Sequence, residues 1–176
     1  MNKFNKWLVF SCLIVLVGCM AAPNNSSCFS AQTGDLTEAQ KKITQIARAQ
    51  NAMGWHYYNG DGVPKSFEES FKWFYKSANL CEASAQFNVG MMYQKGEGVK
   101  QDFNEAIKWY LKSAEQGNSS AQLNLGMMYI SARGVDRNIN EGIKWLSKAA
   151  DQGDATAKKN LEWLFEQGYV KEFSRK

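Results

Sequence analysis

The chain has 176 residues, 44% of them hydrophobic and 22% charged, which is long enough for one domain with its own core. Two of its 21 basic residues fall in the first 18 positions, and the 19 that remain face 17 acidic residues, a net of +2. Positive and negative residues alternate without the basic cluster that phosphate binding needs, which excludes nucleic acid as an expected partner.

Residues 1–18 have the pattern of a secretory signal. Two lysines precede an almost unbroken apolar run from Trp7 to Gly18, which is too short to span a bilayer comfortably. The run ends in Leu16-Val17-Gly18-Cys19, which resembles the bacterial lipobox, so the resemblance implies cleavage before Cys19 and lipid attached to it. The alternative is ordinary signal cleavage near Ala21 or Ala22, followed by release.

Residues 19–35 are rich in Ser, Asn, Gly and Pro, and we expect a flexible tether there, before a domain spanning residues 36–176. Met20 follows Cys19, where an Asp would indicate retention in the inner membrane of Gram-negative bacteria. The resemblance therefore implies a lipid-anchored protein of the bacterial cell envelope. If the source is Gram-negative, it implies the periplasmic side of the outer membrane.

The four cysteines have different expected fates. Cys12 would leave with the signal and Cys19 would carry lipid, so that Cys28 and Cys81 remain. In an oxidising envelope compartment, a single remaining pair predicts a disulfide. The alternative is a buried Cys81 and a free Cys28.

The rest of the chain repeats with a period of 36 residues. A fixed period of roughly 20 to 50 residues is typical of solenoids, in which similar units stack to form an extended binding surface. The recurring segments are Gly54-Trp55-His56-Tyr57, Gly90-Met91-Met92-Tyr93 and Gly126-Met127-Met128-Tyr129, and later Trp73-Phe74, Trp109-Tyr110 and Trp145-Leu146.

Each repeat is predicted to be two helices joined by a glycine loop. In Ala85–Gln94 the pattern residues fall on one stripe at helical spacing, and Gly96-Glu97-Gly98-Val99 ends that helix. The second helix of each repeat is predicted to start at a capping box, in which the first side chain accepts a backbone N–H and an acid reaches back. The three boxes are Ser66 with Glu69, Asp102 with Glu105, and Asn138 with Glu141.

The first helix of each repeat contains a glycine. Gly54, Gly90 and Gly126 cost their helices about 1 kcal/mol each relative to alanine, which close approach of a partner helix would offset. The expected neighbours are Trp73, Trp109 and Trp145, and His56 is expected to pack on the core side. Thr37-x-x-Gln40 opens a periodic segment with no breaker before Asn59, which predicts one long helix.

The repeat resembles the Sel-one-like repeat (SLR), a subclass of the tetratricopeptide helix-turn-helix repeats. The resemblance rests on Ala-x4-Gly-x2-Tyr-x2-Gly-x-Gly-Val and Ala-x2-Trp-Tyr-x-Lys-Ser-Ala-x2-Gly, read from Ala85 to Gly117, and it covers residues 49–168. It implies an all-α fold, a right-handed α-α superhelix (solenoid) of about three repeats plus a C-terminal capping helix. The repeats are expected at residues 49–81, 85–117 and 121–153, with a half-repeat at 154–168.

The sequence departs from this pattern at three positions, and each departure leads to a prediction. Ala132 replaces the first loop glycine of the third repeat, so that turn is expected to be tighter or part of a longer helix. Cys81 replaces the helix-ending glycine found as Gly117 and Gly153, which indicates a local role for Cys81. Glu162 stands where a fourth helix glycine would be, and the charged half-repeat is expected to cap the core.

In the family, the positions of the first helices opposite the core-forming ones line the concave face. Here most of them are apolar or aromatic, and methionine, tryptophan and tyrosine suit an interface that binds a protein or peptide partner. The alternative is that these side chains pack among themselves as an inner core. The predicted inner-face residues are Asn51, Trp55, Tyr58, Phe87, Met91, Gln94, Leu123, Met127, Ile130, Lys159 and Trp163.

The resemblance implies an envelope-anchored adaptor, with no catalytic residues, cofactor or metal site. A β-lactam-binding or β-lactam-hydrolysing SLR enzyme is the alternative from another class. Against it, Ser-x-x-Lys is absent, His56 is the only histidine, and the repeats lack the paired cysteines of cysteine-rich members. A narrower interaction role, neutralising a toxin or binding a host protein, also stays open, as does the oligomeric state.

Overall fold

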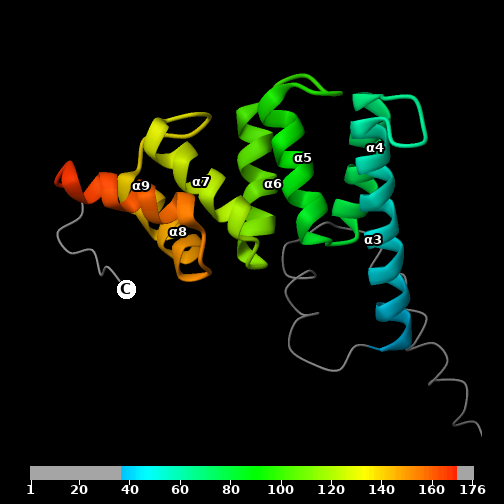
Figure 1. The fold of residues 1–176 in the computed structure, drawn as a ribbon, viewed down its shortest axis with the longest axis horizontal. Helices are drawn as coiled ribbons and strands as arrows, with labels where there is room; N and C mark the ends of the chain where they lie inside the picture. The colour runs from blue at the N-terminus through cyan, green and yellow to red at the C-terminus, as the bar shows by residue number, and fades with distance from the viewer. Residues whose placement is uncertain (1–36, 170–176) are drawn as a thin grey trace, which may run out of the picture. The chain divides into compact units, whose positions relative to one another are not determined.

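The computed structural model describes residues 37–169, which fold into seven α-helices without strands (Figure 1). Residues 1–36, with the predicted signal, Cys19 and Cys28, lie outside this range. The helices are α3 (Glu38–Asn59), α4 (Phe67–Asn79), α5 (Ala83–Lys95), α6 (Phe103–Glu115), α7 (Ser119–Ser131), α8 (Ile139–Asp151) and α9 (Ala155–Glu166).

The helices form three antiparallel pairs and a final single helix. Within the pairs, α3 packs on α4, α5 on α6, and α7 on α8. Successive pairs join through α4 with α5 and α6 with α7, and α9 closes the series against α8, as Figure 1 shows. The predicted fold class, an all-α solenoid of three helix-turn-helix repeats with a C-terminal helix, is therefore confirmed.

α3 has 22 residues, whereas the first helices of the next two repeats, α5 and α7, have 13 each. Its start is a complete capping box, in which the Gln40 N–H donates to Thr37 Oγ1 (3.3 Å) and the Thr37 N–H donates to Gln40 Oε1 (2.8 Å). The single long helix predicted from Thr37 to Asn59 is confirmed.

The second helices start where the caps predicted, at Ser66, Asp102 and Asn138, whose side chains each accept a backbone N–H from three residues ahead. The other half of the predicted capping box, in which the acid accepts the backbone N–H of the cap residue, is wrong. Each acid instead forms an ion pair with the lysine three residues later, because that side chain lies within reach on the same helix face. These pairs are Glu69–Lys72 (2.6 Å), Glu105–Lys108 (2.6 Å) and Glu141–Lys144 (3.4 Å).

The first helix of each repeat ends at a residue in the left-handed region. Gly60, Gly96 and Ala132 have φ values of 85°, 74° and 56°, and each donates its N–H to the carbonyl four residues back. The expectation of a tighter turn or longer helix at Ala132 is wrong, since α7 ends like the others. The hydrogen bonds of the loop hold Ala132 in the left-handed conformation, in which a Cβ costs about 1–2 kcal/mol.

The helix glycines permit close packing within each pair, but the partner residue differs from the one expected. A Cβ at Gly54 would collide with the Phe74 ring, and one at Gly90 would lie 2.7 Å from the Tyr110 ring. At Gly126 it would lie 2.9 Å from the Gly142 carbonyl oxygen. The predicted tryptophan neighbours are therefore wrong by one position, because adjacent helical residues point about 100° apart.

Two of the tryptophans instead pack at the joints, where the second helix of one pair meets the next pair. Trp109 and Trp145 are each 6% exposed, and they pack in core clusters that include residues of the preceding second helix, such as Ala78 and Ala114. A lysine three residues later lies over each ring, at 4.3 Å for Lys112 and 4.1 Å for Lys148. Trp73, one period earlier, is only half-buried.

Two glutamines link consecutive repeats through hydrogen bonds. Gln86 Nε2 donates to the Ala78 carbonyl (3.2 Å), and Gln122 Nε2 donates to the Ala114 carbonyl (3.0 Å). Their own Oε1 atoms accept from Gln116 and Gln152, each at 2.7 Å. Buried polar groups need such partners, so this network sets the register between pairs.

Candidate partner-binding face

The predicted inner-face residues all lie on the first helices of their repeats, α3, α5, α7 and α9. Four of them are exposed. Trp55 is 38% exposed, Met127 37% and Trp163 52%, and Lys159 is exposed as well. Trp55, Met127 and Trp163 occupy the same place in their helices, directly after the repeat glycine or, in α9, after Glu162. The first helices α3, α7 and α9 therefore each expose one large apolar side chain at this position, whereas Met91 of α5 is half-buried.

Other inner-face residues are half-buried and belong to the packing of the stack. The Phe87 ring lies 5.7 Å from that of Tyr110, and Met91 packs against the core cluster around Val89 and Met92. Leu123 and Ile130 pack against the cluster formed by α8 and α9. These four side chains contribute to the core. A partner can therefore reach fewer of the inner-face residues than the sequence predicted.

Asn51 and Gln94 form hydrogen bonds that link neighbouring helices. Asn51 Oδ1 accepts a hydrogen bond from Asn88 Nδ2 (3.0 Å), which links α3 to α5. Gln94 Oε1 accepts from the Tyr110 hydroxyl (2.7 Å), and the Gln94 carbonyl accepts from Gln101 Nε2 (2.8 Å). Burial raises the pKa of Tyr110, which keeps its hydroxyl protonated as a donor.

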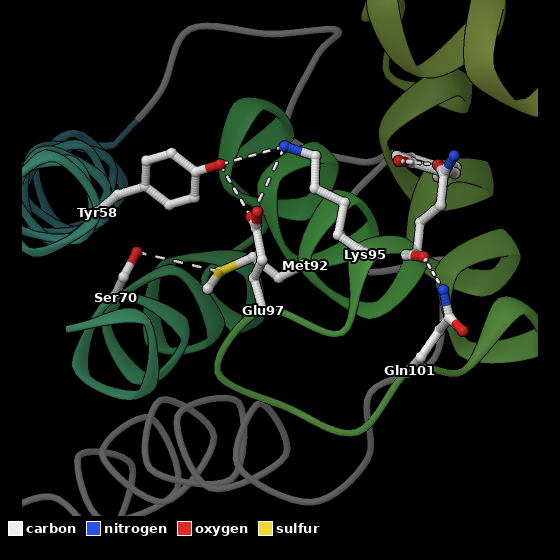
Figure 2. Close-up of polar contacts among 8 residues, drawn as sticks. Tyr58, Ser70, Met92, Lys95, Glu97 and Gln101 are labelled. Carbon is white, nitrogen blue, oxygen red and sulfur yellow. Dashed lines mark hydrogen bonds and ion pairs between the residues drawn. The ribbon is translucent and has the colours of Figure 1, made fainter.

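Tyr58 is the centre of a polar contact between the first two repeats (Figure 2). Its hydroxyl donates to Glu97 Oε2 (2.9 Å) and accepts from Lys95 Nζ (3.2 Å), and Lys95 lies 3.7 Å from the Glu97 carboxylate. The hydrogen bond to Tyr58 and the charge of Glu97 raise the pKa of Lys95, which stays charged. Figure 2 shows the three side chains converging from α3, the end of α5 and the loop after it.

Sequence reasoning missed Lys95 and Glu97 as neighbours of Tyr58. The available signal was variation at equivalent positions, since Ser131 and Arg133 replace them one period later. The trio therefore occurs at one repeat junction only. Beside it, the Trp55 ring makes edge contacts with the rings of Tyr58 (5.2 Å) and Phe74 (5.4 Å), so Trp55 is held in place while part of its surface stays exposed.

His56 lies near the end of α3 and is exposed, so the expected packing role is wrong. Its Nδ1 lies 3.0 Å from the Asp61 carbonyl oxygen. Within residues 37–169, no three histidine, cysteine, aspartate or glutamate residues cluster as metal ligands would. Over the same range, no helix is both long enough and apolar enough to cross a membrane.

Cys81 stands at the junction of α4 and α5 with φ 64°, where Gly117 and Gly153 have φ values of 91° and 92°. Cys81 thus adopts the left-handed backbone of the glycines that it replaces. Its predicted pairing with Cys28 involves a residue outside the described range and stays a prediction.

Known proteins share this architecture. The Sel1 repeat family model matches residues 47–80, 83–118 and 119–154. A Sel1 repeat protein from Oxalobacter formigenes is 35% identical, with a TM-score of 0.68 over 82% of this chain and 55% of that one. The c5321 protein of uropathogenic Escherichia coli, a protective antigen displaying an SLR fold, is 34% identical with a TM-score of 0.69, over 82% of this chain and 32% of that one.

A third structure, the Helicobacter pylori cysteine-rich protein B, is 21% identical with a TM-score of 0.56, over 70% of this chain and 96% of that one, and it shows the fold alone. The present chain spans about half and one third of the lengths of the first two proteins. No curated protein matches the chain significantly in sequence. The three matched repeats cover more than half of its residues, and the chain belongs to the Sel1 repeat family.

Proposed function

We propose that this protein is a binding scaffold that holds a partner protein or peptide along the exposed part of its first helices. Sel1 repeats commonly mediate protein–protein interactions and generally form a non-catalytic scaffold. The observation that carries the proposal is the exposure of Trp55, Met127 and Trp163 at the same helical position. Large apolar side chains exposed on the surface of a folded protein are a usual mark of an interface.

The chemistry of these side chains favours an extended apolar contact with few charges. Tryptophan supplies a large rigid contact area, and methionine adapts its flexible thioether to different partner shapes. Lys159 lies one helical turn before Trp163 and adds a positive charge at one end. A partner segment with spaced apolar residues and an acidic residue near α9 fits this surface.

The test is to select binding peptides from a random library on the full chain and compare their affinities for variants. The triple variant Trp55→Ala, Met127→Glu, Trp163→Ala should weaken selected peptides by at least about a hundredfold. Leu80→Ala is the matched control, because Leu80 is 37% exposed at the end of α4 and belongs to none of the core clusters. Equal affinity of the triple variant and the wild type for every selected peptide would refute the proposal.

We also propose an envelope location with a lipid anchor at Cys19, on the periplasmic side of the outer membrane in a Gram-negative cell. The support is the Leu16-Val17-Gly18-Cys19 motif at the end of the apolar run. Feeding cells an alkyne-bearing fatty acid should label the wild-type protein and leave Cys19→Ala unlabelled. Labelling that persists in Cys19→Ala would overturn the anchor.

We infer that Cys28 and Cys81 form a disulfide. The support is the backbone of Cys81, whose φ of 64° lies in the left-handed region that residues other than glycine rarely adopt. Digestion of the mature protein without reductant should release one cross-linked peptide containing both residues. Recovery of both cysteines alkylated without prior reduction would contradict it.

We further propose that the protein acts without catalysis of its own, since the His56 side chain is exposed and, among residues 37–169, its one hydrogen-bond partner is the Asp61 carbonyl. A chromogenic β-lactam offers a direct check. Hydrolysis that a single point substitution abolishes would replace the scaffold proposal by an enzymatic one.

A further inference from the structure

Among residues 37–169, nothing covers a face at the N-terminal end of the helix stack that every later repeat buries. In α5, Ala85, Val89 and Met92 are fully buried in the cluster shared with α4. The equivalent residues of α7 and α9 are buried in the same way, namely Ala121, Leu125, Met128, Ala157, Leu161 and Leu164. One period before Ala85, Val89 and Met92 stand Ala49, Met53 and His56, of which Ala49 and His56 are exposed and Met53 is half-buried.

Trp73 extends this open face onto α4. Its equivalents Trp109 and Trp145 are 6% exposed because each lies against the second helix of the preceding pair. Trp73 has no preceding pair among the described residues and is half-buried. Ile46 lies on the same stripe of α3 as Met53, two turns earlier, and is 51% exposed. We define the end face as Ile46, Ala49, Met53, His56 and Trp73.

The packing at the joints between repeats indicates which kind of element fits the end face. At all three joints between repeats, the equivalent face receives one α-helix: α4 on α5, α6 on α7, and α8 on α9. The apolar residues that the first two of these helices bring to the joint are a large residue, a second one four positions later and an alanine three further on. Phe71 and Ala78 of α4 and Ile107, Leu111 and Ala114 of α6 belong to the core clusters at these joints. Tyr75 of α4 lies at the edge of its joint, with its ring 5.4 Å from that of Trp109.

A second copy of this chain cannot supply that helix by continuing the stack. The second helices α4, α6 and α8 are already covered by α5, α7 and α9. The free end of the other copy would present α9, a first helix, which does not have the alanine-containing face that the joint requires. In residues 1–36, none of the three alanines follows two large apolar residues at this spacing. The end face therefore fits a helix from a different protein.

We propose that the end face is a docking site for one amphipathic helix of a partner protein, seated as α4 is on α5 and as α6 is on α7. The docked helix would place its alanine near Ala49, as Ala78 and Ala114 lie in the same core clusters as Ala85 and Ala121 in the joints of the stack. Its large apolar residues would cover Trp73, which gives the contact an aromatic anchor. This site is separate from the first-helix surface that carries the proposed scaffold function.

The test uses a helix of known fit as the probe. A peptide with residues 102–118 of this chain, cross-linked into a helix between positions 104 and 108, is labelled at one end and titrated into the full chain. Both cross-linked positions are exposed in α6, so the linker stays off the contact. The cross-link is needed because a free helix of this length is marginal in water. Saturable binding by fluorescence anisotropy is the expected result.

Three matched variants assign the binding to the end face. Ala49→Arg should weaken the peptide at least about tenfold, because Ala49 is exposed in the free chain but would be buried in the complex. Met127→Glu should leave the affinity unchanged, and the peptide carrying Leu111→Glu should bind at least about tenfold more weakly. Absence of saturable binding, or equal binding by Ala49→Arg, would overturn the proposal. If only Met127→Glu lost affinity for the peptide, the peptide would bind the first-helix surface, and this result would also overturn the proposal.

Discussion

Ala132 occupies the left-handed position that Gly60 and Gly96 occupy in the other two loops, with φ 56°. Replacing it by glycine removes the repulsion between Cβ and the backbone, while the unfolded chain gains some freedom. We expect Ala132→Gly to raise the free energy of unfolding by about 0.5–1 kcal/mol. Chemical denaturation followed by circular dichroism measures this difference.

Gly96→Ala is the control for that experiment, because it introduces the same strain in the second loop. It should lower stability by about 1 kcal/mol or more, since its Cβ would also lie 3.2 Å from that of Gln101. Equal stability of Ala132→Gly and the wild type would show that the loop relaxes around alanine without cost.

Gln50 is a second residue at which one repeat departs from the others. Its Oε1 atom is buried without a hydrogen-bond partner within the described residues, whereas Gln86 and Gln122 accept from Gln116 and Gln152. The position equivalent to Gln116 in the first repeat is Leu80, which cannot donate and is 37% exposed. A buried acceptor without a partner costs about 1–3 kcal/mol.

Leu80→Gln should therefore stabilise the protein by about 1 kcal/mol, by giving Gln50 the donor that the other repeats have. Gln152→Leu is the mirror experiment, and it should destabilise by a similar amount by leaving Gln122 without its donor. Both are read from the midpoint of urea unfolding. If the two variants shift the midpoint in the same direction, the hydrogen bond is not the cause.

At the scale of helices and loops, the second glycine of the later two loops is a contact point between repeats. A Cβ at Gly98 would collide with the Phe67 carbonyl at the start of α4, and one at Gly134 would lie 2.5 Å from the Phe103 Cβ at the start of α6. A Cβ at Gly62 would meet nothing within 4 Å. All three glycines have positive φ, between 69° and 73°. The loops are therefore alike in backbone and differ in what lies beside them.

Gly98→Ala should lower the free energy of unfolding by about 3 kcal/mol or more, because it adds a collision with backbone to the cost of the left-handed conformation. Gly62→Ala carries the conformational cost alone and should lose about 1 kcal/mol. The comparison by thermal and urea unfolding separates the two effects. Equal losses would mean that the loop moves away from α4 without penalty.

At the scale of the whole molecule, α9 closes the stack. Leu161 and Leu164 are buried against α8, together with Leu146 from the second helix. Each fully buried leucine is worth about 1.5–3 kcal/mol in area removed from water. A chain ending after Gly153 should therefore lose roughly 5 kcal/mol and bind a hydrophobic dye.

A chain ending after Gly168 is the control for this truncation. It keeps α9 intact and loses, among described residues, only Tyr169, whose ring lies 5.9 Å from the Arg137 guanidinium. Its stability should stay within about 1 kcal/mol of the full chain. A stable, dye-free chain ending at Gly153 would contradict the capping role of α9.

The sequence by itself determined the period, the helix pairs, the second-helix starts and the closing helix. Each of these depends on local chemistry, such as the caps at Ser66, Asp102 and Asn138, and is repeated three times. Repetition lets one local signal be checked against two others. The Ala132 turn was mispredicted because local preference opposes the left-handed conformation that the loop hydrogen bonds hold.

Only the tertiary structure decided which side chains stay exposed. The inner-face positions of Met91 and Met127 are equivalent in sequence, yet Met91 packs against a core cluster and Met127 is 37% exposed. His56 and Met92 are likewise equivalent, and only His56 lacks a covering helix among the described residues. A repeating sequence specifies one unit, but burial depends on the neighbours of that unit, which differ between the end and the middle of the stack.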